Sequence, residues 1–212
     1  MKLVSLFLVL SFLSFSVHGA SQEEDGPVAI KTQDGYLLVW NAPDIHFMLS
    51  VKGKEVKAMN STEYVFFNVD GMAFQVQSVA VGKFLGETDK QTSSDLQILT
   101  AHRDWESQFI ENELLRKKLD VQSTSLKLTD GSQALLWRFN MPEGISTEVK
   151  SQMYLAMVRS GHVILLNGSV PKNAEESAVQ KFLVDSGATL KLSPSRINVR
   201  DLAESIRKGT VQ

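Results

Sequence analysis

Two side chains in the middle of the sequence have the spacing of metal ligands. His102 and Glu106 are four residues apart, which on a helix places both side chains on one face, a turn from each other. Imidazole and carboxylate groups both bind zinc, which takes three or four protein ligands. A further ligand would have to come from His46 or His162. The alternative, which we expect, is that both residues lie on a solvated polar face beside Arg103 and bind no metal.

Nucleophilic catalysis has no recognisable motif in this chain. The G-x-S-x-G elbow is absent, and no S-x-x-K stands at a convincing helix start. The zinc-protease, CxxC, EF-hand, P-loop and dinucleotide-binding patterns are also absent. Ser160-Gly161-His162 is more typical of a hairpin turn than of a catalytic pair. We therefore expect no catalytic residue and no cofactor, with an enzyme that uses an unrecognised site as one alternative.

Large apolar side chains are concentrated in two of the expected strands, where they could bind an apolar ligand. They are Trp137, Phe139, Met141, Met153 and Met157. Methionine packs adaptably, so such strands could line a pocket for a small apolar ligand. Filling of an ordinary core is the commoner use of these residues. A carrier of a small apolar ligand is therefore a second alternative.

Two triplets match the pattern for attachment of N-linked sugars. They begin at Asn60 and Asn167 and would be used only in a eukaryotic secretory route. Such triplets arise easily by chance, and the second lies in an expected strand. We expect both to be unused.

The first residues have the organisation of a signal peptide. Met1 and Lys2 give a positive start, and residues 3–17 are apolar apart from scattered serines. This run is shorter than the roughly 20 apolar residues of a membrane-spanning helix, and small residues follow it. We expect cleavage after Gly19 or Ala20, which makes residues 1–19 a signal peptide and leaves no membrane span.

The composition limits which cellular compartment and which classes of partner we expect for this protein. The formal net charge is −2 and no basic cluster stands out, which argues against nucleic acid or an anionic membrane surface as the main partner. The chain has no cysteine, so it has neither disulfides nor a thiol for a lipid anchor. We expect a secreted or periplasmic protein, and the lack of disulfides favours a bacterial origin.

Alternating apolar residues and tight turns predict strands in the first part of the chain. Expected hairpins surround Asp34-Gly35 and Asp70-Gly71. A further strand runs from Ile45 to Val51. Residues 82–94 are polar and predict a surface loop, and residues 95–119 lack Gly and Pro and predict the longest helix.

The second part of the chain predicts four more strands and a helix. The strands cover 121–128, 133–141, the alternating residues around 153–157, and 162–166. Asn173 and Glu176 have the spacing of a capping box for a helix that ends near Gly187. A short last strand over 189–192 and an amphipathic helix in the tail complete the pattern.

These elements predict an α+β fold, in which an antiparallel sheet carries two main helices and a short C-terminal amphipathic helix follows. The expected division is a signal peptide over 1–19, one α+β domain over 20–193 and a helical tail over 194–212. Residues 134–192 resemble the PsbP-like group, which includes photosystem extrinsic subunits and envelope proteins of the DcrB type. The matching segments are Leu136-Trp137-Arg138-Phe139, Tyr154-Leu155-Ala156-Met157-Val158, Gly161-His162-Val163-Ile164-Leu165-Leu166 and Phe182-Leu183.

Members of the PsbP-like group tend to be non-enzymatic binding or assembly factors. The resemblance therefore implies an interaction role and transfers no functional residue. Our hypothesis is an exported, non-catalytic module that binds an envelope or secreted protein through a sheet edge, the long loop or the tail.

Overall fold

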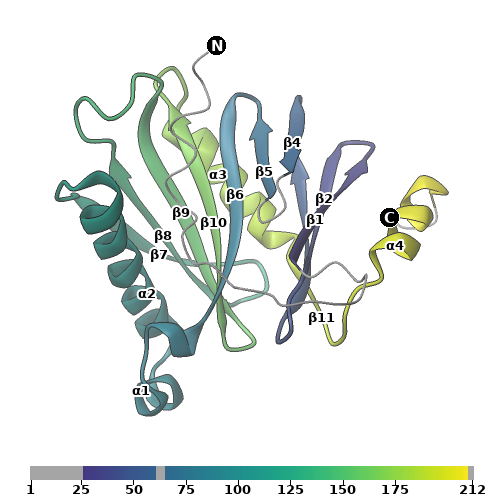
Figure 1. The fold of residues 1–212 in the computed structure, drawn as a ribbon, viewed down its shortest axis with the longest axis horizontal. Coiled ribbons are helices and arrows are strands. Elements are labelled where there is room, and N and C mark those ends of the chain that lie inside the picture. The colour runs from purple at the N-terminus through teal and green to yellow at the C-terminus, as the bar shows by residue number, and fades with distance from the viewer. Residues whose placement is uncertain (1–25, 61–64, 210–212) are drawn as a thin grey trace.

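Eleven strands in two antiparallel sheets dominate the described part of the protein (Figure 1). The structure is a computed structural model, and it describes residues 26–60 and 65–209. The expected signal peptide, residues 1–19, lies outside the described residues.

The smaller sheet has four strands in the order β1-β2-β3-β11. They are β1 (Gly26–Thr32), β2 (Gly35–Asn41), β3 (His46–Lys52) and β11 (Lys191–Ser193). The hairpin predicted around Asp34-Gly35 is confirmed, because Thr32 pairs with Gly35 at the end of the β1–β2 ladder. β11 pairs with β3, so the C-terminal part of the chain completes a sheet that the N-terminal part begins.

The larger sheet has seven strands in the order β4-β5-β6-β10-β9-β8-β7. They are β4 (Val56–Asn60), β5 (Val65–Val69), β6 (Met72–Ala80), β7 (Val121–Lys127), β8 (Gln133–Asn140), β9 (Val149–Arg159) and β10 (His162–Pro171). β10 lies at the centre and is buried along almost its whole length, as its apolar sequence predicts.

Two of the predicted hairpin turns in this sheet have the backbone that their sequences favour. Asp70 and Gly71 have φ values of 51° and 85°, and Ser160 and Gly161 have 47° and 74°. Positive φ at both central residues is the mark of a type I′ turn, whose twist matches that of the flanking strands. The turns therefore fix the registers of β5 with β6 and of β9 with β10.

Helices lie on both faces of the larger sheet (Figure 1). The helical segments are η2 (Val81–Lys83), α1 (Glu87–Thr92), α2 (Asp95–Phe109), η3 (Ile110–Leu115), α3 (Glu176–Ala188) and α4 (Val199–Arg207). α2 packs on β8 and β9, whereas α3 packs on β9 and β10 from the other side and also contacts β3. None of the described helices is long and apolar enough to cross a membrane.

The two faces of the larger sheet enclose separate hydrophobic clusters. One fills the space between the sheets and α3, and it includes Phe47, Phe67 and Leu183. The other lies under α2 and includes Leu99 and Trp137. The α+β class is confirmed, although the antiparallel strands form two sheets where the sequence suggested one.

The predicted long helix ends earlier than expected. Its α-helical part stops at Phe109, a wider π-helical segment continues to Leu115, and Arg116 takes a left-handed conformation with φ 51°. The carboxylate of Glu111 then accepts a hydrogen bond from the backbone N–H of Leu119 at 2.7 Å. This bond turns the chain back toward β7, so residues 116–119 are not helical.

Two smaller expectations were wrong, and one strand was missed. The region 82–94 is not a plain loop, since it contains α1 and the end of η2. Strand β4 was not predicted, because its sequence mixes polar and apolar residues. The capping box of α3 does not form: its N-cap is Glu175, without a side-chain hydrogen bond, while Glu176 turns toward Arg138 on β8.

The C-terminal tail is bound to the outer side of the smaller sheet. The side-chain amide of Asn41 donates to the carbonyl of Ile197 at 2.9 Å and accepts from the N–H of Ile197 at 3.0 Å. The predicted tail helix is present as α4, which Asn198 caps and which contacts β1.

Candidate functional site

His102 and Glu106, the candidate metal ligands, lie in the interior and not on a solvated face. Their side chains belong to the stripe of α2 that faces the sheet, between Ile98 one turn before and Ile110 one turn after. His102 is 0% exposed and Glu106 is 6% exposed. The expectation of a solvated polar face was therefore wrong for these two residues, although their neighbour Arg103 does reach out to Asp104 and to Ser123 of β7.

His102 is enclosed by aromatic rings. Phe84 meets it nearly edge-on at a centroid distance of 5.1 Å, and Trp105 lies at 5.8 Å. Among the described residues, neither ring nitrogen of His102 has a hydrogen-bond partner. Burial disfavours the charged imidazolium and lowers the pKa of His102 to about 4. The side chain is therefore neutral at physiological pH.

Glu106 on α2 and Tyr154 on the sheet beneath it lie in the same buried cluster as His102. Burial raises the pKa of Glu106 to about 7. Burial and the nearby Glu106 carboxylate also raise the pKa of Tyr154 on β9. Tyr154 stacks on Trp137 of β8 with ring centroids 3.8 Å apart, and Trp137 Nε1 has no hydrogen-bond partner among the described residues. The cluster is thus costly to bury and is closed to solvent.

The other histidines do not join this cluster. His46 begins β3 in the smaller sheet. His162 begins β10, where its Nε2 lies 3.1 Å from Asp44 Oδ2 and its Nδ1 lies 3.1 Å from the carbonyl of Ser160. Within residues 26–60 and 65–209, no three His, Cys, Asp or Glu side chains gather as a metal site. His46 and His162, the two possible further ligands, are therefore not brought together with His102 and Glu106.

The remaining motifs have structural explanations. Ser160-Gly161-His162 forms the predicted turn, and both ring nitrogens of His162 are engaged, so the ring is not placed to activate a serine. Asn167 lies inside β10 and is only 7% exposed, so a sugar could not be attached in the folded protein. Asn60 ends β4, and the rest of its triplet falls outside the described residues.

The aromatic and methionine residues fill the core. Trp137, Phe139, Met153 and Met157 are each at most 2% exposed and belong to the two hydrophobic clusters, while Met141 packs at the margin of the cluster under α2. These side chains occupy the space that an apolar ligand would need, so the arrangement gives the carrier alternative no support.

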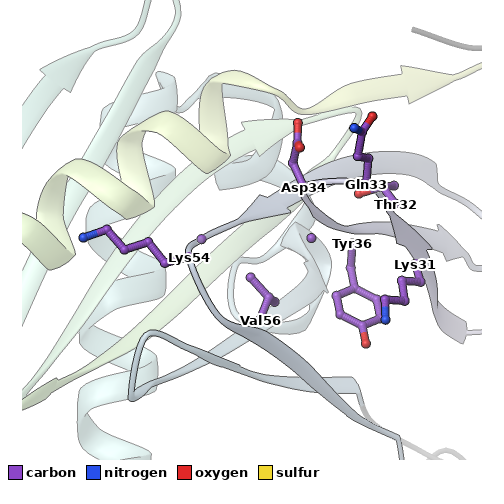
Figure 2. A pocket seen from close by; sticks show the side chains of 9 residues that line it. Lys31, Thr32, Gln33, Asp34, Tyr36, Lys54 and Val56 are labelled. Atoms are coloured by element: carbon purple, nitrogen blue, oxygen red, sulfur yellow. The ribbon is translucent and has the colours of Figure 1, made fainter.

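One surface hollow of about 330 Å³ opens between the β1–β2 turn and the loop before β4. Figure 2 shows that its charged side chains do not converge: Lys54 points away from Lys31, and Asp34 lies on another side. Asp34 also forms an exposed ion pair with Lys52 at 3.8 Å. A shallow, polar surface of this kind lacks the built geometry of a catalytic site.

The open edge of the larger sheet offers a clearer functional feature. β7 pairs with β8 on one side, and no described strand lies on its other side. Gln122, Ser123, Thr124 and Ser125 are all exposed. No backbone hydrogen bond joins residues 121–127 to any described residue beyond β8. This strand was predicted from the sequence, but its edge position was not.

A second hollow, of about 160 Å³, lies beside this edge on the face opposite α2. Gln122 and Thr124 of β7, Leu136 and Arg138 of β8, and Met153 of β9 line it together with α3. Arg138 donates to Glu176 at 2.9 Å and to Gln122 at 2.8 Å, so its charge is already compensated. The β7 edge and this hollow form one continuous candidate binding surface, which we call the β7 site.

Fold and site together define an α+β protein with an open sheet edge. No family model matches the chain, and no curated protein matches it.

Proposed function

We propose that this protein is an exported, non-catalytic interaction module that binds an extended segment of an envelope or secreted protein along β7. The observation that carries the proposal is the exposed outer edge of β7, whose backbone groups have no partner within the described chain. Addition of a strand to such an edge gives affinity through main-chain hydrogen bonds. Export is supported by the apolar leader over residues 1–19.

The other sheet edges are protected, which makes β7 distinctive. Natural edges are guarded by charges, proline, bulges or shortness. β11 has only three residues, β1 is contacted by α4, and β4 carries Lys57 in an ion pair with Glu55. In contrast, residues 121–126 contain no charge and no proline, and all seven β7–β8 pairs are in regular register.

The compact interior supports a binding role over catalysis. His102 and Glu106 are closed to solvent, and both nitrogens of His162 are engaged. We also propose a relationship to the PsbP-like group, supported by the consecutive strands β8, β9 and β10 followed by α3. That group's binding and assembly roles agree with an interaction module.

A unique thiol on β7 tests the proposal. The chain has no cysteine, so Ser125→Cys provides a single attachment point for a photo-activated crosslinker. We expect Ser125→Cys to capture a discrete partner from the native envelope or secreted fraction. Thr88→Cys on the exposed helix α1 serves as the matched control and should capture none.

A second variant separates strand addition from ordinary surface contact. Adding Thr124→Lys to Ser125→Cys places a charge at the centre of the edge and should lower the crosslinking yield roughly tenfold, with no change in stability. Equal yields from Ser125→Cys and Thr88→Cys would overturn the proposal. A crosslinked product made of two copies of this chain would overturn the proposal that the partner is a different protein.

A further inference from the structure

The hollow of the β7 site stands where an added strand would place its side chains. Register pairs Gln122 with Arg138 and Thr124 with Leu136, so these four side chains point to the same face of the sheet. An extended segment beside β7 presents every second side chain to this face. Those side chains lie next to Gln122 and Thr124, at the entrance of the hollow.

α3 leaves the hollow open by covering only part of the sheet. The helix begins at Glu176 and packs on β9 and β10, not on β7. Glu176 and Gln180, one turn apart, therefore form a wall that faces β7 across the uncovered part of β8. A side chain that enters from β7 must cross more than one strand spacing of about 4.8 Å, so only a long side chain fills the hollow.

Charge in the hollow argues against a charged occupant. The Arg138–Glu176 pair is balanced, with the two side chains 31% and 35% exposed, and Arg138 is bonded to Gln122 as well. An added acid would compete with Glu176, and an added base would compete with Arg138. A neutral side chain enters without breaking this pair.

The lining favours an aromatic ring with a polar end. Leu136 and Met153 supply an apolar floor, and a methionine sulfur packs favourably at the edge of an aromatic ring. Thr124, Gln122 and Gln180 supply hydroxyl and amide groups at the rim. Such a rim suits the hydroxyl of a tyrosine, which is apolar along its length and polar at its tip.

We infer that the hollow is a specificity pocket that selects a tyrosine at an inward-facing position of the segment bound along β7. This inference rests on the proposed function, because the side chain is delivered by strand addition. Gln180 is the residue that discriminates tyrosine from alanine, whereas the β7 backbone binds any extended segment.

Disulfide tethering to Ser125→Cys tests the inference. The probes are short peptides of alternating threonine and valine that contain one cysteine, with a guest residue directly beside it. Ser125 and Thr124 point to opposite faces, so a peptide cysteine opposite position 125 delivers the guest to the hollow. The equilibrium constant of the mixed disulfide should be at least tenfold higher for a tyrosine guest than for alanine, glutamate or lysine guests.

Variants of the wall give the matched comparison. Gln180→Ala should reduce the tyrosine preference to less than about threefold and leave the alanine-guest peptide unchanged, whereas Ser177→Ala on the exposed side of α3 should have no effect. Equal tethering of all guests at Ser125→Cys, above the level at Thr88→Cys, would overturn the pocket and leave the proposed function standing. Tethering no better than at Thr88→Cys would overturn both.

Discussion

At the residue scale, the main result is that His102 and Glu106 are buried ionisable groups with no ionic partner among the described residues. The pKa of Glu106 rises from 4.5 to about 7 because the folded state disfavours the carboxylate. Its contribution to stability is therefore lost as pH rises from 4.5 through about 7. The pKa of His102 falls from 6.5 to about 4, so its contribution is lost as pH falls from 6.5 through about 4.

These opposite effects predict a flat pH profile for the native protein. Between pH 4.5 and 6.5 the two slopes have opposite signs and similar size, so the free energy of unfolding should change little. Urea denaturation across this range checks the prediction. A steep monotonic change would contradict it.

Single substitutions should uncover each slope. With Glu106→Gln, the free energy of unfolding should rise by about 3 kcal/mol from pH 4 to 7. In this variant only His102 must change its protonation on folding, and the loss of its proton costs less free energy as pH rises. With His102→Leu, it should instead fall by about 3 kcal/mol over the same range. Glu113→Gln on the exposed side of η3 is the control and should leave the native profile unchanged. Slopes of the same sign in the two buried variants would contradict this account.

The burial of His102 and Glu106 was hard to predict from the sequence, because polar residues on a helix usually face solvent. The apolar residues Trp105 and Phe109 are only partly buried, whereas the buried stripe of the helix has polar residues at its centre. The available signal was the spacing of four from Ile98 to His102, Glu106 and Ile110. Hydrophobic periodicity gives little weight to such a stripe.

At the element scale, close approach of α3 to the sheet limits what its last turn can contain. A Cβ built on Gly187 would lie 2.9 Å from Leu155 Cδ2 and 3.4 Å from Met157 Sδ. Gly187→Val should therefore lower the free energy of unfolding by about 2 kcal/mol through overpacking. Ser177→Val carries the same β-branched side chain on the exposed side and should cost less than about 1 kcal/mol. Equal losses measured by urea denaturation would show that helix propensity, not packing, is responsible.

The start of α2 offers a second test at this scale. Ser94 Oγ accepts from the N–H of Gln97, and the Gln97 side chain accepts from the N–H of Ser94, which completes a capping box. Ser94→Ala should lower the free energy of unfolding by about 1 kcal/mol. Ser93→Ala, one residue earlier, provides the control in the same denaturation experiment. Equal effects of the two substitutions would contradict the cap.

Strands bounded by tight turns were the most predictable elements. The sequences Asp70-Gly71 and Ser160-Gly161 act locally, so their hairpins follow from a few residues. The division into two sheets depends on long-range pairing, such as β11 with β3, and the open β7 edge depends on strand order. Neither has a local signal, so the β7 site could not be placed from the sequence.

At the scale of the whole molecule, the tail is joined to the smaller sheet by Asn41, which is 1% exposed. Asn41→Ala removes both bonds to Ile197 and leaves that backbone unpaired, so α4 should lose its attachment. We expect at least tenfold faster amide exchange in residues 199–207 and little change in α3. Unchanged exchange in α4 would show that its contact with β1 is sufficient.

The same attachment bears on the order in which the chain can fold as it is synthesised. Asn41 and Ile197 are 156 residues apart, and the smaller sheet receives its fourth strand from residues 191–193. The ribosome must therefore have released residues 191–197 before this layer can close, and pairing between such distant segments is slow. A translocase that accepts only unfolded substrates would have that interval in which to engage the nascent chain.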